Sequence, residues 1–490
     1  MAQRIAPIPR RQLAAILGAG TLFAPTNRSA RAEEAGPIMQ DLSAYMAAAG
    51  DAPLPEPIIE AAKHHLLDTF AAMISGTTLL PGERAIGFAR RFGGNGPGSI
   101  VGAAFACTPG EAALANGMLA HADETDDSHA PSASHPGCAV VPAALAVAEA
   151  LGGIGGAAFL RAVVLGYDIG PRVNLALGAW RFRAESHRST HSIAGTFGAA
   201  AAAGAVAGLS AQQFRWLLDF AAQQASGIAS WARDPDHIEK AFVFGGMPAR
   251  NGVAAALLVA SGATGIEDVF SGVDNFFIAH VPDARPEELL EGLGIRFEVA
   301  RTNIKRWTVG SPIQAPLDGI DAMRRRHPFT AEQVRSVEVR LAAQQARVVD
   351  GREVPDINLQ HMVAIMLLDG TASFEAAHDV PRMRSPDVLR QRAKVRLVPD
   401  AALEALLPHR ESVVEIHLLD GTVLSERVRA VRGTIDNLMT REEVVAKCRD
   451  LIAPVLGQAR TTGLIDTVFE LERVDDIRQL RPLLQPGQAQ

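Results

Sequence analysis

The spacing of hydrophobic positions along the chain changes near residue 303. Between about residues 36 and 272, alanine, leucine and valine recur at helical spacing, interrupted by glycine and proline, which predicts an almost entirely helical region. Beyond Asn303, residues 337–341 and 394–398 are typical of strands. Residues 413–428 predict a hairpin that turns at Asp420-Gly421.

These patterns predict a mainly α protein with a smaller α+β part. We expect a helical domain over residues 36–283, an α+β domain over 284–432, and a return to helix over 433–490. Alanine and glycine are abundant and only 5% of the residues are aromatic, which suits close packing of helices. The small-residue run at 195–209 is shorter than the roughly 20 residues that span a bilayer.

Composition narrows the class of protein. The chain has 490 residues, 48% of them hydrophobic, and is therefore globular with a large core. Its net charge is −7 and it has no basic stripe, so we expect no nucleic-acid partner. Cys107, Cys138 and Cys448 are too far apart for a disulfide framework or a paired-cysteine metal site. We expect Cys138 to be a small buried hydrophobic residue.

The first 32 residues have the order of an export signal. Arg10 and Arg11 precede an apolar stretch at 13–24, and the small-residue sequence Ala30-Arg31-Ala32 follows. This order predicts a twin-arginine signal peptide and a periplasmic protein that does not associate with the membrane once the signal is removed. A disordered extension of a cytoplasmic protein is the alternative.

The most informative segment is the acidic loop, residues 121–137, which reads HADETDDSHAPSASHPG. A helix is predicted before it at 109–119, and His121 falls on that helix's apolar face; a buried helix is predicted after it. Burial and like charges can move pKa values toward neutrality. One of Asp126 and Asp127 could therefore hold a proton as general acid while a nearby histidine or carboxylate acts as base.

Two other interpretations of the acidic loop stay open. It could be a solvated loop in which an aspartate caps the next helix. It could also bind a metal, but no HExxH or paired-cysteine spacing accompanies it, so we predict no metal ligand here.

Several motifs occur in the order seen in one known family. The acidic loop is followed by VVPAALAVAEAL, GYDIGPRVNLALG, GTFGAAAAAG and GGMPARNGVAAALLVASGATGIEDVFSG, and later by VPDAALEALLP and RGTIDNLMTREEVVAKCRDL. Over about residues 37–475 the chain thus resembles the MmgE/PrpD family. This family includes 2-methylcitrate dehydratases, cis-aconitate decarboxylase and iminodisuccinate epimerase.

The resemblance implies a large helical domain built from both chain ends, a smaller α+β lid domain and a homodimer. It also implies an enzyme that needs no metal or organic cofactor. Reactions at a carbon next to a carboxylate require a base, an acid and cationic groups that hold carboxylates.

Carried over onto this sequence, the family's loop motif falls on His121, Glu124, Thr125, Asp126, Asp127, Ser128 and His135. Glu124 stands where an aspartate is usual, and Ser128 where a threonine is usual. Ser189 occupies a position usually held by histidine, and Phe244 another. In the lid segment KRWTVGSPIQAP, Gly310, Ser311 and Gln314 replace titratable or cationic groups.

We therefore predict a lyase, most simply a dehydratase or hydratase of a small hydroxylated polycarboxylate similar to 2-methylcitrate. The predicted catalytic residues are Asp126, Asp127, His135, His191 and Glu124. The predicted substrate-binding residues are Ser128, His129, Arg188, Lys240, Lys305 and Arg306. An epimerase or isomerase of a small dicarboxylate is one alternative, and an exported carboxylate-binding protein without catalysis is the other.

Overall fold

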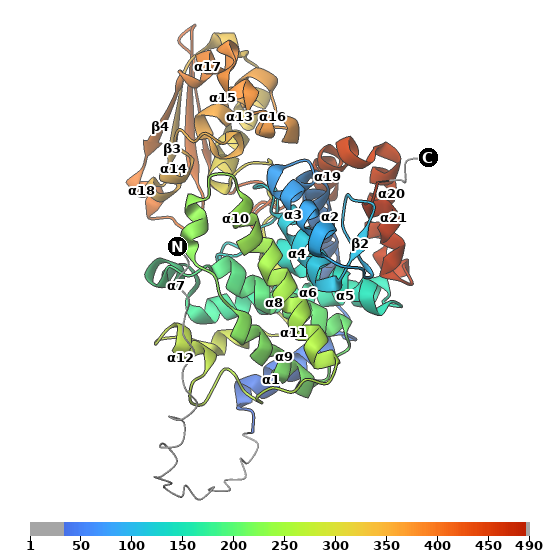
Figure 1. The fold of residues 1–490 in the computed structure, drawn as a ribbon. Coiled ribbons are helices and arrows are strands. Elements are labelled where there is room, and N and C mark those ends of the chain that lie inside the picture. The colour runs from blue at the N-terminus through green and yellow to red at the C-terminus, as the bar shows by residue number, and fades with distance from the viewer. Residues whose placement is uncertain (1–33, 487–490) are drawn as a thin grey trace, which may run out of the picture. The chain divides into compact units, whose positions relative to one another are not determined.

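The computed structural model describes residues 34–486. The predicted export signal lies outside these residues. Residues 35–486 form one compact unit, which is mainly helical and carries a four-stranded sheet in its C-terminal half (Figure 1).

The helical part begins at residue 37. Its helices are α1 (Pro37–Ala49), α2 (Glu56–Gly76), α3 (Leu80–Phe92), α4 (Pro109–Ala120), α5 (Gly137–Leu151), α6 (Gly156–Leu177), α7 (Ala179–Ser186), α8 (Thr190–Val206), α9 (Ala211–Gln224), α10 (Ile238–Ala241), α11 (Met247–Ala260) and α12 (Phe276–His280). Two short strands, β1 (Gly98–Ser99) and β2 (Ala106–Cys107), pair between α3 and α4. The helix predicted at 109–119 is confirmed as α4.

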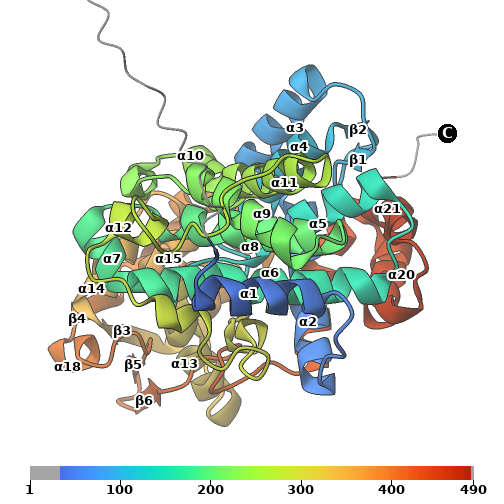
Figure 2. The same ribbon diagram turned by 90° about the horizontal axis from the view of Figure 1, so that it is seen from below.

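Small residues bring the central helices together. α8 lies against α5, α6 and α11, and Figure 2 shows α6 and α8 side by side in the middle of the helical part. A Cβ atom added at Gly198 of α8 would lie 2.8 Å from the carbonyl oxygen of Gly166 in α6, so the two backbones touch. The low aromatic content predicted this close approach, because a larger side chain would separate the helices.

The C-terminal half contains the sheet, in the order β4-β3-β5-β6. Its strands are β3 (Val334–Leu341), β4 (Val395–Pro399), β5 (Ser412–Leu418) and β6 (Val423–Val428). β3 pairs parallel with β4 and antiparallel with β5, and β5 and β6 form the predicted hairpin. The helices here are α13 (Ser311–Arg326), α14 (Ala343–Val349), α15 (Leu359–Asp369), α16 (Phe374–His378), α17 (Pro386–Arg392) and α18 (Ala401–Glu404).

The described residues bury two main hydrophobic cores. The smaller core contains side chains of 307–418, among them Ile313 of α13, Met362 of α15 and Val339 of β3. The larger core contains side chains of 39–304 and of 439–484. The change from one core to the other thus comes after residue 304, and Leu289 and Phe297 lie in the larger core.

The last helices return to the larger core. They are α19 (Arg441–Leu456), α20 (Gln458–Phe469) and α21 (Arg481–Leu484). α19 packs on α2, and Figure 1 shows the red C-terminal helices beside the blue α2. Both ends of the described chain therefore build the same core.

One continuous helical run, residues 238–260, is long and apolar enough to cross a membrane by composition alone. It comprises α10, the π-helix η2 (Phe242–Gly246) and α11, and it packs against α4 and α8. Most of its apolar stretch is buried inside the protein, which is what a core helix requires.

Gly245 of η2 sets the distance between this run and α4. A Cβ atom added at Gly245 would overlap the carbonyl oxygen of Gly117 in α4. We expect Gly245→Ala to lower the free energy of unfolding by about 3 kcal/mol, because backbone rather than a flexible side chain has to move. The control is Gly87→Ala in α3, where an added Cβ meets nothing within 4 Å, and it should raise stability by about 0.5–1 kcal/mol. Urea unfolding of both variants tests this, and equal effects would contradict it.

Candidate active site

The acidic loop lies between α4 and α5, as its sequence predicted, and it is buried there. His121 is the C-cap of α4, and α5 begins at Gly137. Glu124, Asp126 and Asp127 are buried, so the solvated-loop interpretation is wrong. The expectation that an aspartate of the loop caps the next helix is confirmed, because the backbone N–H of Gly137 at the start of α5 donates to Asp127 Oδ1 over 3.1 Å.

Asp126 and Asp127 are neighbours in sequence but contact different groups. Asp127 Oδ2 accepts a hydrogen bond from the Tyr167 hydroxyl (2.6 Å) and lies 2.9 Å from His65 Nδ1. Together with its bond to Gly137, these contacts satisfy Asp127 within the larger core. The structure therefore gives Asp127 the position of an anchor for the loop.

Asp126 lies at the centre of a histidine cluster. Its carboxylate is 2.9 Å from His121 Nδ1 and 3.1 Å from His135 Nδ1. Lys305 Nζ is 3.6 Å from Asp126 Oδ1. Burial alone would raise the pKa of Asp126, but the charges of His121, His135 and Lys305 outweigh it and hold this pKa well below its usual range. Asp126 is thus ionised at neutral pH.

The geometry fixes the roles of the His135 ring nitrogens. Because Nδ1 donates to Asp126, Nε2 carries the lone pair. Burial lowers the pKa of His135 to about 4, helped by Lys305 and opposed by Asp126. His135 is therefore neutral at physiological pH and can accept a proton at Nε2.

His191 reaches the cluster from the first turn of α8. Its ring stacks on Phe244 with centroids 3.7 Å apart, and it lies 5.2 Å from the His135 ring. His121 stacks on Phe244 as well, at 4.3 Å. The Nδ1 atom of His191 is buried without a hydrogen-bond partner, and burial holds the pKa of this residue well below its usual range.

Glu124 pairs with two lysines. Lys240 of α10 forms an ion pair with its carboxylate, and Lys305 lies 3.6 Å away while donating to the Glu124 carbonyl oxygen over 2.7 Å. Burial alone would raise the pKa of Glu124, but Lys240 and Lys305 keep it well below its usual range. Lys305 is the more deeply buried of the two lysines, so Lys240 is the one closer to solvent.

The other residues predicted to bind substrate make structural contacts or lie away from the histidine cluster. His129 is buried between Ser132 Oγ (2.7 Å) and Glu298 (2.9 Å). Ser128 pairs through its backbone with Asn303. Arg188 pairs through its backbone with Ile228, and its charge acts on His280 rather than on the acidic loop.

Arg306 is the neighbour of Lys305 but faces away from the acidic loop. Its guanidinium pairs with Asp318 and Asp321. It lines a polar hollow of about 500 Å³ in which arginines pair with carboxylates of the same chain. The structure therefore does not bring Arg306 to Asp126.

Residues of the C-terminal half that no sequence motif indicates also reach the loop. His378 of α16 lies 3.1 Å from Asp123, whose charge outweighs burial and raises the pKa of His378 to about 9. Asp356 has a buried Oδ1 atom without a partner, and burial raises its pKa to about 7, with Glu124 and Asp123 adding and His378 and Lys240 opposing. Arg410 also lies close enough for the charge of Glu124 to act on it.

Two groups have atoms close enough to share a metal ion. They are His121, Glu124 and His237, and His121, Asp126 and Cys138. Glu124 already pairs with Lys240 and Lys305, so a cation bound there would face two ammonium groups. Burial and the nearby carboxylates hold the pKa of the Cys138 thiol well above its usual range, so the thiol is protonated in the absence of a metal. The two ammonium groups therefore oppose a further cation beside Glu124.

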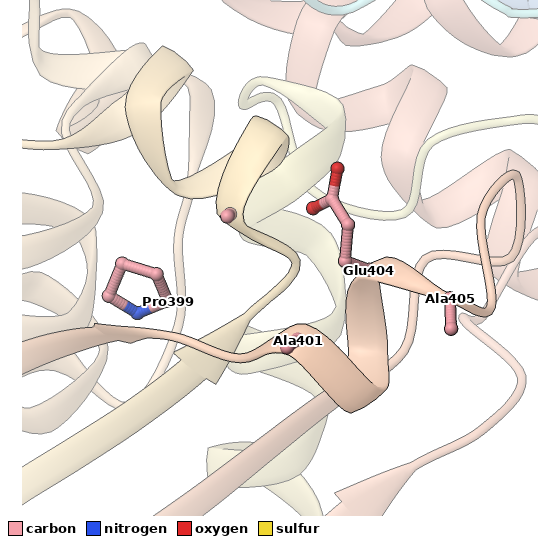
Figure 3. Close-up of a pocket in the computed structure, with 5 residues that line it drawn as sticks. Pro399, Ala401, Glu404 and Ala405 are labelled. Carbon is pink, nitrogen blue, oxygen red and sulfur yellow. The ribbon is translucent and has the colours of Figure 1, made fainter.

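A second hollow lies apart from this cluster. It measures about 450 Å³ and lies beside α14 and α18, lined by Ala343, Pro399, Ala401, Glu404 and Ala405 (Figure 3). Glu404 is its one ionisable residue, so it offers no acid–base pair.

Comparison with known proteins agrees with the motifs. The chain is 25% identical to the cis-aconitate decarboxylase-like protein oryM of Aspergillus oryzae, covering 92% of this chain and 97% of that protein. It is 25% identical to a cis-aconitate decarboxylase of Aspergillus terreus, covering 88% and 92%, and 26% identical to that of Mus musculus, covering 89% and 91%. The family models of the MmgE/PrpD N-terminal and C-terminal domains match residues 40–289 and 307–471. With both domains matched in order, the chain belongs to the MmgE/PrpD family.

Proposed function

We propose that the protein is a lyase that acts on a small polycarboxylate by moving a proton at a carbon next to a carboxylate. The observation that carries this proposal is the carboxylate of Asp126, which is shared by Nδ1 of His121 and of His135. It leaves a neutral imidazole with a free Nε2, oriented as a general base needs to be. The cis-aconitate decarboxylases among the relatives support the lyase class.

In this proposal His135 removes the proton and cations stabilise the charge that develops. Removing a proton next to a carboxylate creates an enolate-like anion, which requires a positive group close by. Lys240 lies closer to solvent than Lys305, and Lys305 holds the loop backbone. The His191 ring lies beside that of His135, and its Nδ1 atom is buried without a hydrogen-bond partner.

We propose Asp356 as the proton donor for the leaving group. In a dehydration the base takes the proton from one carbon, the C–O bond of the next carbon breaks, and the departing hydroxide accepts a proton to leave as water. Asp356 is buried, has a free carboxyl oxygen, and can hold a proton near neutral pH. This supports a dehydratase or hydratase without a metal or organic cofactor, as the family resemblance implies.

A decarboxylase is the second candidate, because the curated relatives named above carry that activity in their names. Decarboxylation breaks a C–C bond, releases CO₂ and adds a proton to the carbon left behind. Decarboxylation therefore depends more on a proton donor than on a general base. The two reactions therefore use the same cluster but leave different products.

Proton and ¹³C NMR of the purified chain in heavy water separate the candidates. The substrates are citrate, 2-methylcitrate, malate and cis-aconitate, with ¹³C label in the carboxyl groups. Formation or hydration of an alkene with all carboxyl label retained supports the dehydratase, and labelled bicarbonate supports the decarboxylase. Deuterium exchange without either product indicates an epimerase. Binding without any exchange would overturn the lyase and leave a carboxylate-binding protein.

The proposed roles predict a bell-shaped dependence of kcat/KM on pH. His135 must be neutral, so activity falls as pH drops through about 4, and Asp356 must be protonated, so activity falls as pH rises through about 7. Asp356→Asn should lower kcat and remove the upper limb. An unchanged upper limb in this variant would show that another group donates the proton.

A further inference from the structure

Trp231 lies at an edge of the histidine cluster where hydrogen-bond donors outnumber hydrogen-bond acceptors. Its ring meets the His191 ring edge-on with centroids 5.3 Å apart, and the Phe244 ring at 4.7 Å. It belongs to the short helix η1 (Ala229–Arg233) and is buried. Its Nε1–H group has no hydrogen-bond partner among the described residues.

Two arginines approach this edge from different parts of the chain. The Arg183 guanidinium of α7 lies 4.8 Å from the centre of the Trp231 ring. Arg410, from the segment between α18 and β5, lies near enough for Arg183 and Glu124 to act on its charge. Burial lowers the pKa of both arginines. Within residues 34–486, neither guanidinium forms an ion pair or a hydrogen bond.

A third cation completes the arrangement. Lys240 Nζ lies 5.7 Å from the Trp231 ring centre, and its one carboxylate partner is Glu124. The edge thus combines an indole donor, two arginines without acceptors and a lysine. Arg183 and Arg410 are half-buried, and like charges that are partly removed from water repel one another unless an anion lies between them. A carboxylate is planar and accepts two hydrogen bonds from a guanidinium, which makes it the natural anion for this place.

We propose that Arg183, Arg410 and Trp231 Nε1 form a subsite that binds one carboxylate of the substrate next to His191. This inference rests on the proposed function and extends it to substrate choice. A molecule whose only carboxylate lies at the reacting carbon cannot reach this subsite. The subsite therefore selects dicarboxylates and tricarboxylates over monocarboxylates. Arg183 lies in the N-terminal half and Arg410 in the C-terminal half, so binding joins the two halves.

The test is calorimetric titration of the full chain with tricarballylate, a tricarboxylate without a hydroxyl group to eliminate. We expect Arg183→Ala and Arg410→Ala each to weaken binding roughly 10- to 100-fold, because each removes a charged pair. The control is Arg181→Ala, two residues earlier in α7, whose exposed side chain pairs with Asp283. It should bind as the wild type does. Unchanged affinity in both Arg183→Ala and Arg410→Ala would overturn the subsite.

A more conservative variant keeps the test valid if an arginine variant fails to fold. Trp231→Phe keeps the ring and removes only the Nε1–H donor, and we expect binding about 5-fold weaker. Affinity equal to that of the wild type would remove Trp231 from the subsite. Arginine-dependent binding by a chain that turns over no polycarboxylate would sustain the subsite while overturning the lyase. A wild-type chain that binds neither tricarballylate nor cis-aconitate would overturn both.

Discussion

Asp126→Asn is expected to lower kcat by about 10³- to 10⁴-fold on whichever polycarboxylate the protein turns over. The carboxylate accepts from Nδ1 of both His121 and His135, and an amide has only one oxygen to offer. At least one histidine would then face an N–H group and take the other tautomer, which places its proton where the lone pair is needed. Single-turnover rates measure the effect without interference from product release.

Asp127→Asn is the matched control, since it makes the same chemical change one residue away. Its partners Tyr167, His65 and Gly137 belong to the fold, so we expect a loss of about 2 kcal/mol in stability but a kcat within 10-fold of the wild type. The assignment of Asp126 fails if its variant retains more than a tenth of the wild-type rate, or if the Asp127 variant loses as much.

Lys447→Met is expected to destabilise the protein by about 3–5 kcal/mol. Lys447 of α19 lies 2.6 Å from Asp68 of α2, and both side chains are almost fully buried. Removing the lysine leaves a desolvated carboxylate with no counter-charge. It also removes the hydrogen bond that Lys447 Nζ donates to the Thr125 carbonyl oxygen of the acidic loop over 2.9 Å.

Lys63→Met tests whether the loss of stability comes from burial of the lysine itself or from burial of its carboxylate partner. Lys63 is nearly as buried as Lys447, but its partner Glu472 is 38% exposed and stays hydrated when the lysine is lost. We therefore expect a loss of about 1 kcal/mol. The midpoints of urea unfolding compare the two variants, and the double variant Lys447→Met/Asp68→Asn should recover part of the loss. Equal destabilisation by both lysine variants would count against this account.

Local spacing predicted the parts of the site that a few residues determine. α4, the β5–β6 hairpin and the place of the acidic loop between two helices follow from turn residues and hydrophobic period within short windows. The same windows could not separate Asp126 from Asp127, or Lys305 from Arg306. Neighbouring side chains in irregular backbone point in different directions, and no period records which one faces the cluster.

Site residues that come from distant segments of the chain were even harder to predict from sequence patterns. Asp356, His378 and Arg410 each stand alone in sequence, and they reach the loop only because the C-terminal half folds against it. Trp231 and His237, in contrast, lie in a sequence pattern that could have indicated a site. They occur with Arg233, Asp234 and Asp236 in one short polar stretch beside Lys240, in a chain with only four tryptophans.

The bond from Lys447 to the backbone of the acidic loop also constrains the order in which the protein can mature on the ribosome. The donor follows its acceptor, Thr125, by 322 residues. At translation rates of roughly 5–20 residues per second, the loop waits on the order of tens of seconds for this anchor. Until α19 emerges, Asp68 has no counter-charge and the loop lacks its last support. We expect nascent chains that end before Lys447 to hold the histidine cluster unassembled, so that chemistry begins only when synthesis is nearly complete.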